Sequence, residues 1–405
     1  MERKRCAVVL CGHGIADPLV STLILDYVLR LQEEGPRTDM LLVTEESDTP
    51  AISAALSDRL KAAGIRWAPL RYRVKGRQFP QKIRNLFILL FRALWFARGY
   101  EERNVIGFLS MAGAYASVLR TLGFTRSIIM NFEPHSQYMK DMGVWREGSF
   151  KYRVVKYFED REVRNADVII APARAVVEHV RHIGTRAVVH EQGVTVDVSA
   201  NARQETEGQR IRSSLGLDGR IVFVYAGKFN GIYHSEVQYA RFMQRSCVAD
   251  ARIHHLVITF EEHAEVLRVE AGRAGVLDRL TIHGPVAPAA LPALLSAADV
   301  GVIAVPPTPS QIYRSPVKTA LYWAAGLPII IAEGVSDDWW IAKERDIGIV
   351  VDDLPILDPA GLRTTLDRLL FGDRHALHER CARAAHELRD TSLMVDLLRR
   401  SLVRP

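Results

Sequence analysis

The residues best suited to bind a phosphate lie in the stretch 315–328. Ser315 can cap a helix, Pro316 suits a first helical position, and a glycine followed by a proline near the end of the stretch is typical of a helix terminus. The amides of Val317 and Lys318 would then stand at the positive end of the helix, where anions bind. The stretch predicts a diphosphate site to which Lys318 adds charge. The alternative is a well-capped structural helix with a solvated lysine.

Two short glycine-containing turns provide further backbone that can approach a phosphate. In residues 225–231, Gly227 allows close approach and Lys228 would neutralise a leaving nucleotide. Gly12 and Gly14 end the first apolar run, in a turn that lacks the third glycine of the GxGxxG dinucleotide pattern. A hydride-transfer enzyme is therefore disfavoured. A P-loop kinase is disfavoured as well, because no GxxxxGK[ST] sequence occurs.

The elements that must position these residues form an alternation of strands and helices that occurs twice along the chain. Short runs rich in Val and Ile alternate with longer helical patterns, which is typical of parallel sheets covered by helices on both faces. The predicted strands of the first series are 6–11, 39–44, 104–109, 127–132, 167–171 and 187–190. Those of the second series are 221–225, 253–260, 280–283, 300–305, 328–332 and 347–351. We therefore expect an α/β protein with two Rossmann-like, doubly wound domains.

The two series predict the domain boundaries. We expect an N-terminal domain over residues 1–196, a polar interdomain linker over 197–217, a C-terminal domain over 218–385 and a C-terminal helix over 386–405. Ligands of doubly wound sheets lie beyond the carboxyl ends of the strands. Two facing sheets would therefore hold both substrates in one groove.

Length and composition agree with two domains in the cytoplasm. The 405 residues exceed one typical domain, and 48% of them are hydrophobic, enough for two buried cores. The cysteines show neither zinc-site nor disulfide spacing, which favours a reducing compartment. The first apolar run is too short for a signal peptide or a membrane span. The net charge of +6 suits phosphates or anionic surfaces and does not require nucleic acid.

A series of motifs resembles the GT4-like (group 1) branch of the GT-B glycosyltransferases, in the same order along nearly the whole chain. The motifs are residues 131–139, 166–172, 192–197, 225–231, 283–286, 298–302, 315–328 and 346–351. The resemblance implies GT-B architecture, in which two Rossmann-like domains face each other across a cleft. It implies a nucleotide-sugar donor held mainly by the C-terminal half, an acceptor on the side of the N-terminal domain, and a last helix that packs back on that domain. It also implies retention of anomeric configuration without a bound metal.

The resemblance distributes the donor over several of these motifs. It implies that the base lies near the turn formed by Gly284, Pro285 and Val286, and the diphosphate near Lys228 and Lys318. The donor-binding set further includes Gly12, Gly14, Gly227, Tyr313, Arg314, Ser315 and Val317. Lysines and helix amides would replace a metal electrostatically.

Three positions depart from the pattern of the family. Leu321 stands where a glutamate would bind the donor ribose, Tyr313 stands where a second glutamate is expected, and Tyr233 replaces a phosphate-binding lysine. Leucine cannot accept the ribose hydrogen bonds, and one lost charge-assisted bond costs roughly 1.5 to 3 kcal/mol. The departures permit an unusual donor site, and they equally permit a chain that has lost catalysis.

Glu133 and His135 are the catalytic candidates. They flank Pro134 just after a predicted strand, and the proline keeps the turn extended. By the resemblance, His135 contacts the transferred sugar or stabilises charge, and Glu133 orients the acceptor hydroxyl or its proton. The alternative is a loop histidine beside a capping glutamate.

Residues 71–98 are basic and aromatic and contain no acidic residue. The cations are Arg71, Arg73, Lys75, Arg77, Lys82, Arg84, Arg92 and Arg98. Apolar residues recur near helical spacing, which predicts an amphipathic helix on an anionic membrane, close to a lipid-linked acceptor. The alternative is a helix packed in the core after a solvated loop.

We therefore expect a glycosyltransferase in the cytoplasm, either free or peripheral at the inner membrane face. It would use a nucleotide-sugar and a small-molecule, glycan or lipid-linked acceptor, with no metal, other cofactor or nucleic acid. Two alternatives stay open: a catalytically silent GT-B scaffold or sugar-nucleotide-binding subunit, and a GT-B-fold sugar-nucleotide epimerase that releases free nucleotide without an acceptor. The sequence leaves open the sugar, the base, the acceptor, the linkage and the oligomeric state.

Overall fold

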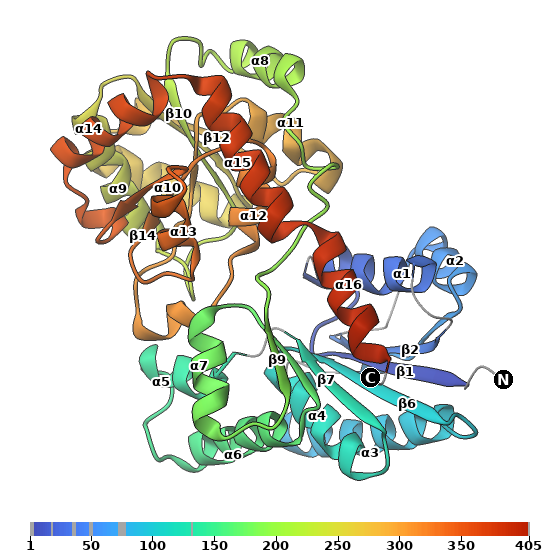
Figure 1. Cartoon of the computed structure of the whole chain (residues 1–405). Coiled ribbons are helices and arrows are strands. Elements are labelled where there is room, and N and C mark those ends of the chain that lie inside the picture. The colour runs from blue at the N-terminus through green and yellow to red at the C-terminus, as the bar shows by residue number, and fades with distance from the viewer. Residues whose placement is uncertain are drawn as a thin grey trace. The chain divides into compact units, whose positions relative to one another are not determined.

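The computed structural model describes residues 4–17, 19–34, 38–47, 52–71, 78–130 and 133–403. Its contacts divide the chain into two compact units, each built around a parallel sheet (Figure 1). Unit 1 comprises Met1–Gly193 and Ser392–Pro405, and unit 2 comprises Val194–Thr391. The predicted α/β class is confirmed.

The strands of unit 1 are β1 Arg5–Cys11, β2 Asp39–Val43, β4 Ile65–Trp67, β6 Glu102–Phe108, β7 Arg126–Met130, β8 Val168–Ala171 and β9 Val188–Glu191. They form a parallel sheet in the order β4-β2-β1-β6-β7-β8-β9. Two short strands, β3 Glu45–Glu46 and β5 Leu70–Arg71, pair separately. The inner strand β1 is buried from Cys6 to Cys11, as its apolar run requires.

Helices cover both faces of this sheet. They are α1 Leu25–Glu34, which continues the π-helix η1 Val20–Ile24, then α2 Ala54–Ala62, α3 Gln78–Phe96, α4 Leu109–Thr121, α5 His135–Asp141, α6 Phe150–Asn165, α7 Arg174–Ile183 and α16 Thr391–Leu402. Helix α4 packs between α3 and α6, and Figure 1 shows these three helices on one face of the sheet. None of the helices in the described ranges has the length and hydropathy needed to cross a bilayer.

Unit 2 repeats the plan with the parallel order β12-β11-β10-β13-β14-β15. Its strands are β10 Ile221–Ala226, β11 Ile253–Ile258, β12 Leu280–His283, β13 Val300–Val302, β14 Ile329–Ala332 and β15 Gly348–Val351. Its α-helices are α8 Glu205–Ser214, α9 Glu236–Ala249, α10 Glu261–Arg273, α11 Leu291–Ser296, α12 Val317–Ala324, α13 Asp338–Glu344, α14 Pro359–Leu370 and α15 Arg374–Arg389. Short 3₁₀ turns connect them: η2 Leu277–Arg279, η3 Pro288–Ala290, η4 Pro309–Tyr313 and η5 Leu354–Ile356.

The structure differs from the predicted segments at several points. Residues 197–217, predicted as a linker, belong to unit 2 and contain α8, which packs on α11. The predicted C-terminal helix 386–405 is divided between the end of α15 and α16, which groups with unit 1. Strand β4 was not predicted, because Arg66 interrupts its short apolar run. Asn131 and Phe132, at the end of one predicted strand, lie outside the described residues.

Candidate active site

The carboxyl edge of the sheet in unit 2 carries the predicted donor-binding residues other than Gly12 and Gly14. Strand β10 runs into Gly227 and Lys228, and β12 runs into the exposed turn that begins at Gly284. The segment after β13 passes through η4, which ends at Tyr313, and Arg314 leads toward α12. Parallel strands place their carboxyl ends at one edge, so these turns line the region where doubly wound sheets bind ligands.

Contacts with two tyrosine rings and with Gly227 direct the side chain of Lys318 toward this edge of the sheet. It lies on the first turn of α12 with only 8% of its surface exposed. Its Nζ is 3.8 Å from the centroid of the Tyr233 ring and 5.2 Å from that of the Tyr225 ring. A Cβ added to Gly227 would lie 2.6 Å from Cε of Lys318, so the lysine occupies this place because residue 227 has no side chain. The alternative of a solvated lysine is wrong.

The ionisation of Lys318 is coupled to that of Tyr233. Burial lowers the pKa of Lys318, and the neighbouring Tyr233 phenol partly opposes this effect. The positive charge of Lys318 in turn lowers the pKa of Tyr233, with smaller contributions from Lys228 and Arg314. Cations from the turn after β10 and from the start of α12 therefore all act on the phenol of Tyr233. A diphosphate within their reach would be stabilised by charge-assisted contacts.

The start of α12 differs from the prediction in one respect. Pro316 occupies the cap position with an extended backbone, and no side chain caps the helix. The hydroxyl of Ser315 instead accepts a hydrogen bond of 2.9 Å from the amide of Val194. The predicted cap by Ser315 is wrong. The helix still begins at Val317. The amide of Thr319 donates to the carbonyl of Pro316 at 3.1 Å, whereas the amides of Val317 and Lys318 precede the first bond of the helix.

The glycines Gly12 and Gly14 lie in unit 1, after β1. A Cβ on Gly14 would lie 2.8 Å from Oε2 of Glu46, and the amide of Ile15 donates a 2.9 Å hydrogen bond to the same carboxylate. The glycine at position 14 is therefore explained by its contact with β3. Gly12 has a looser environment, with Cβ of Met111 at 3.7 Å from an added Cβ.

The turn that carries Glu133 and His135 follows β7 in unit 1 and is anchored to α6. The amide of Ser136 donates a 2.8 Å hydrogen bond to Glu159, and its hydroxyl donates a second one of 2.5 Å. Burial raises the pKa of Glu159 to about 7, although both hydrogen bonds lower it. The ring of His135 lies edge-on to Trp145, with centroids 5.4 Å apart. These contacts hold Ser136 and His135 in place just after the carboxyl end of β7.

Comparison with known proteins agrees with this architecture. Residues 278–384 match the model of the Glucosyltransferase 3-like, C-terminal domain. No curated protein sequence matches the chain. Sucrose-phosphate synthase from Thermosynechococcus elongatus is similar in structure with a TM-score of 0.72 at 15% identity, covering 98% of this chain and 99% of its own. The chain has the GT-B fold.

Two further GT-B structures extend the comparison. Anabaena HepE in complex with UDP has a TM-score of 0.69 at 12% identity, over 98% of this chain and 99% of its own. The α,α-trehalose 6-phosphate synthase from Burkholderia multivorans has a TM-score of 0.67 at 15% identity, over 98% of each chain. The predicted resemblance to GT-B glycosyltransferases is confirmed at the level of the fold.

The carboxyl edge of the sheet in unit 2 also carries polar residues that the sequence did not single out. Buried side-chain oxygens of Ser310, Gln311 and Ser336 have no hydrogen-bond partner within the described ranges. They come from η4 and from the turn after β14, where Ser336 has a left-handed φ of 60° and its amide donates to the carbonyl of Gln311. Such groups can bind hydroxyls of a sugar or ribose. In the sequence they look like ordinary polar loop residues.

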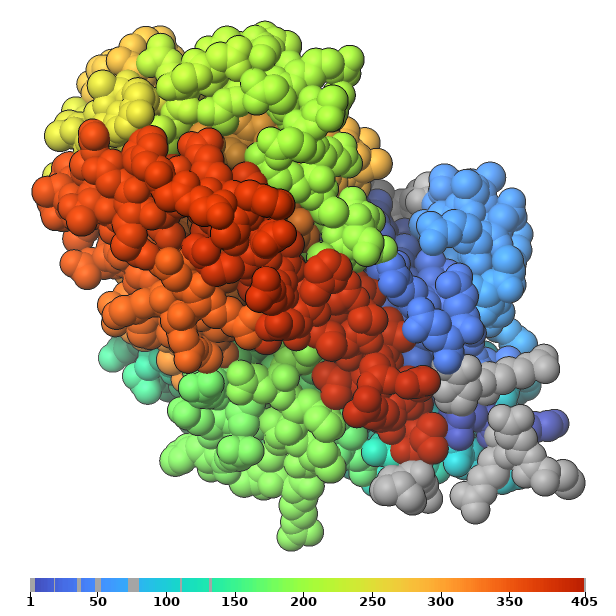
Figure 2. Space-filling view, turned by 45° about the horizontal axis from the view of Figure 1, so that its top comes forward, coloured from blue at the N-terminus to red at the C-terminus, as the bar shows by residue number. Residues whose placement is uncertain are grey.

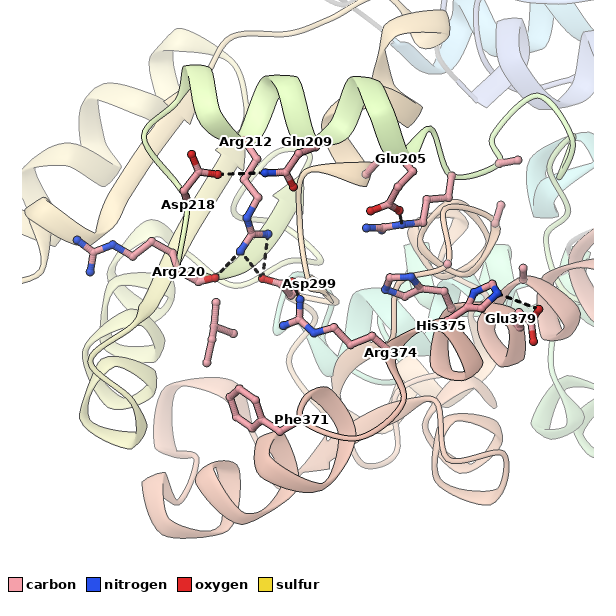
Figure 3. A pocket seen from close by; sticks show the side chains of 18 of the residues that line it. Glu205, Gln209, Arg212, Asp218, Arg220, Asp299, Phe371, Arg374, His375 and Glu379 are labelled. Atoms are coloured by element: carbon pink, nitrogen blue, oxygen red, sulfur yellow. Dashed lines mark hydrogen bonds and ion pairs between the residues drawn. The ribbon is translucent and has the colours of Figure 1, made fainter.

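A cavity of about 980 Å³ in unit 2 lies at the opposite edge of the GT-B sheet, where β10 begins (Figure 3). It lies between α8 and α15. In Figure 2 the green segment that contains α8 and the red C-terminal helices of unit 2 lie on the side that faces the viewer. Arg212 and Arg374 both point at Asp299, with ion pairs of 3.1 Å each (Figure 3). Two more of its arginines, Arg203 and Arg252, also pair with carboxylates. Because each of these four arginines is already paired with a carboxylate, we assign no ligand to this cavity.

Proposed function

We propose that this protein transfers a sugar from a nucleotide-sugar donor to an acceptor, and that unit 2 binds the donor diphosphate through Lys318, Lys228 and the first amides of α12. The observation that carries the proposal is the buried ammonium of Lys318, 3.8 Å from the centroid of the Tyr233 ring. The Glucosyltransferase 3-like match over residues 278–384 supports a glycosyl donor. The HepE complexes with UDP and UDP-glucose make uridine nucleotides the first candidates.

The proposed transfer retains the anomeric configuration and uses no bound metal. The bond between the anomeric carbon and the diphosphate oxygen breaks, and an oxocarbenium-like sugar forms. The acceptor oxygen attacks on the same face and passes its proton to the leaving phosphate oxygen. The positive charges of Lys318, Lys228 and Arg314 support this proposal, because they stabilise negative charge on the leaving group.

Unit 1 serves the acceptor side in this proposal. His135 contacts the transferred sugar, and Glu133 orients the acceptor hydroxyl. Their position after β7, on a turn tied to α6 through Glu159, supports the assignment. The acceptor is a small molecule, a glycan or a lipid-linked sugar. The four cysteines are all free thiols, which supports a cytoplasmic location for the reaction.

A transfer assay tests the proposal. Purified protein is incubated with UDP-, GDP- and ADP-sugars and a panel of acceptors, and release of nucleoside diphosphate is followed. We expect release to depend on the acceptor and to fall by at least about tenfold in Lys318→Ala, because one charge-assisted contact to the leaving group is lost. Lys343→Ala, which removes an exposed lysine of α13, serves as the matched control.

Two other results would overturn the proposal. Nucleotide release that is equally fast without any acceptor would favour the epimerase. Absence of release with every donor and acceptor pair would favour the catalytically silent scaffold.

A further inference from the structure

Helix α3 in unit 1 exposes large apolar side chains to solvent. Phe87, Phe91 and Trp95, spaced four residues apart, are 67%, 68% and 64% exposed. On the opposite side of the helix, Leu89 and Ala93 are completely or almost completely buried. The helix therefore has one apolar face in the core and a second apolar face that the described residues leave uncovered. Residues three and four apart share a helix face, so the aromatic side chains form one stripe.

Side chains of the exposed stripe contact one another and form a continuous surface. The rings of Phe91 and Trp95 stack with centroids 6.2 Å apart, and the guanidinium of Arg98 lies 5.6 Å from the centroid of the Trp95 ring. Ile83 and Leu94, 42% and 37% exposed, extend the apolar surface along the helix. Contiguous exposed apolar surface of this kind marks an interaction site, whereas single exposed apolar residues do not.

The arginines beside the stripe form no ion pair with a carboxylate among the described residues. Residues 78–100 contain no Asp or Glu. Arg84 donates to the amide oxygen of Asn85 at 3.3 Å, and Arg92 donates to the carbonyl of Pro69 at 3.0 Å. Within the described ranges neither arginine, nor Arg98, forms an ion pair. Arg73, Lys75 and Arg77, which complete the predicted basic segment, lie outside those ranges.

We infer that α3 docks the protein on a membrane surface that carries anionic lipid headgroups. Phenylalanine and tryptophan would enter the boundary between headgroups and acyl chains, and the flanking arginines would reach the phosphates. A second copy of the chain fits less well, because a two-fold contact would bring the same arginines against each other without a carboxylate on either helix. The inference is independent of the proposed sugar transfer, because it depends on a helix of unit 1 and the residues proposed to bind the diphosphate belong to unit 2.

Vesicle co-sedimentation tests the inference with the full chain. Vesicles of phosphatidylcholine alone are compared with vesicles that also contain phosphatidylglycerol, at low and high salt. We expect the protein to bind the anionic vesicles at low salt and to be released as salt screens the arginines. The triple variant Phe87→Ser, Phe91→Ser, Trp95→Ser should bind at least about tenfold more weakly, because its apolar contact with the bilayer is lost. Arg84→Ser with Arg92→Ser should weaken binding most at low salt.

Matched controls separate the helix from general surface effects. Val266→Ser with Val269→Ser removes exposed apolar side chains from α10, and Arg241→Ser with Arg383→Ser removes exposed arginines of unit 2. Both controls should bind like the wild type. Quenching of tryptophan fluorescence by brominated lipid provides a second readout that does not depend on the triple variant, and it should disappear in Trp95→Phe.

Three outcomes would overturn the inference. The first is wild-type binding to anionic vesicles no greater than to phosphatidylcholine. The second is triple-variant binding equal to that of the wild type. The third is light scattering that shows a wild-type dimer, a monomeric triple variant and no vesicle binding, which would make α3 a contact between copies.

Discussion

Lys318 and Tyr233 are in contact, and this contact bears on one of the three departures from the family pattern. Tyr233 stands where the resemblance leads one to expect a phosphate-binding lysine. In the structure a lysine from α12 reaches the same phenol, at 3.8 Å from the ring centroid. The positive charge of the site is therefore supplied from a different element.

A titration of the tyrosines tests this pairing. Because the ammonium of Lys318 lowers the pKa of Tyr233, we expect one tyrosine to ionise below the ordinary value of 10. This early step should vanish in Tyr233→Phe and move to higher pH in Lys318→Ala, with Lys343→Ala as the control. Ultraviolet difference absorbance of the phenolate measures it. An unchanged titration curve in Lys318→Ala would show that the two side chains do not interact.

Single residues were predictable only where their role is local. The helix start near Val317 follows from residue types within a few positions, and the sequence indicated it. The partner of Ser315 could not be predicted, because Val194 lies 121 positions away and offers a backbone amide that every residue carries. The polar atoms of Gln311 and Ser336 were missed for the same reason: their burial is decided by the fold.

Among the elements, α8 differs most from expectation. The polar composition of residues 197–217 indicated a linker. In the structure Gly208 is the point at which α8 approaches α11, and an added Cβ would lie 2.6 Å from the backbone and Cβ of Ser296. A glycine that breaks a sequence pattern can therefore mark close helix packing.

Substitution of this glycine gives a stability test. Gly208→Ala should lower the free energy of unfolding by about 1–3 kcal/mol through overpacking, partly offset by the better helix propensity of alanine. Gly272→Ala in α10 is the matched control, because nothing lies within 4 Å of its added Cβ. The control should be neutral or stabilising by up to about 1 kcal/mol. Urea unfolding measures both, and equal stability of the two variants would contradict the packing of α8 on α11.

The strands of both sheets were more predictable than α8. Strands buried on both faces need continuous apolar runs, and β1, β10 and β14 each show one. Strand β4 has only Ile65 and Trp67 around an exposed Arg66, so its pairing with β2 could not be predicted from its own residues.

For the whole molecule, the order of the motifs carried the most information. Each motif is loose by itself, but their succession along the chain predicted the GT-B fold, which the structure and the comparison with sucrose-phosphate synthase confirm. The sugar, the base and the acceptor were not predictable, because they are recognised by side chains that the fold brings together from distant positions.

The central claim is that unit 2 binds a nucleotide-sugar through Lys318. The measurement that tests it most directly is calorimetric titration of UDP-, GDP- and ADP-sugars into the wild type, Lys318→Ala and Lys343→Ala. We predict that one nucleotide class binds and that Lys318→Ala weakens it by roughly tenfold to a hundredfold, as expected for one charge-assisted contact, whereas Lys343→Ala does not. Equal affinity of Lys318→Ala and the wild type, or no binding of any nucleotide-sugar to the wild type, would contradict the claim.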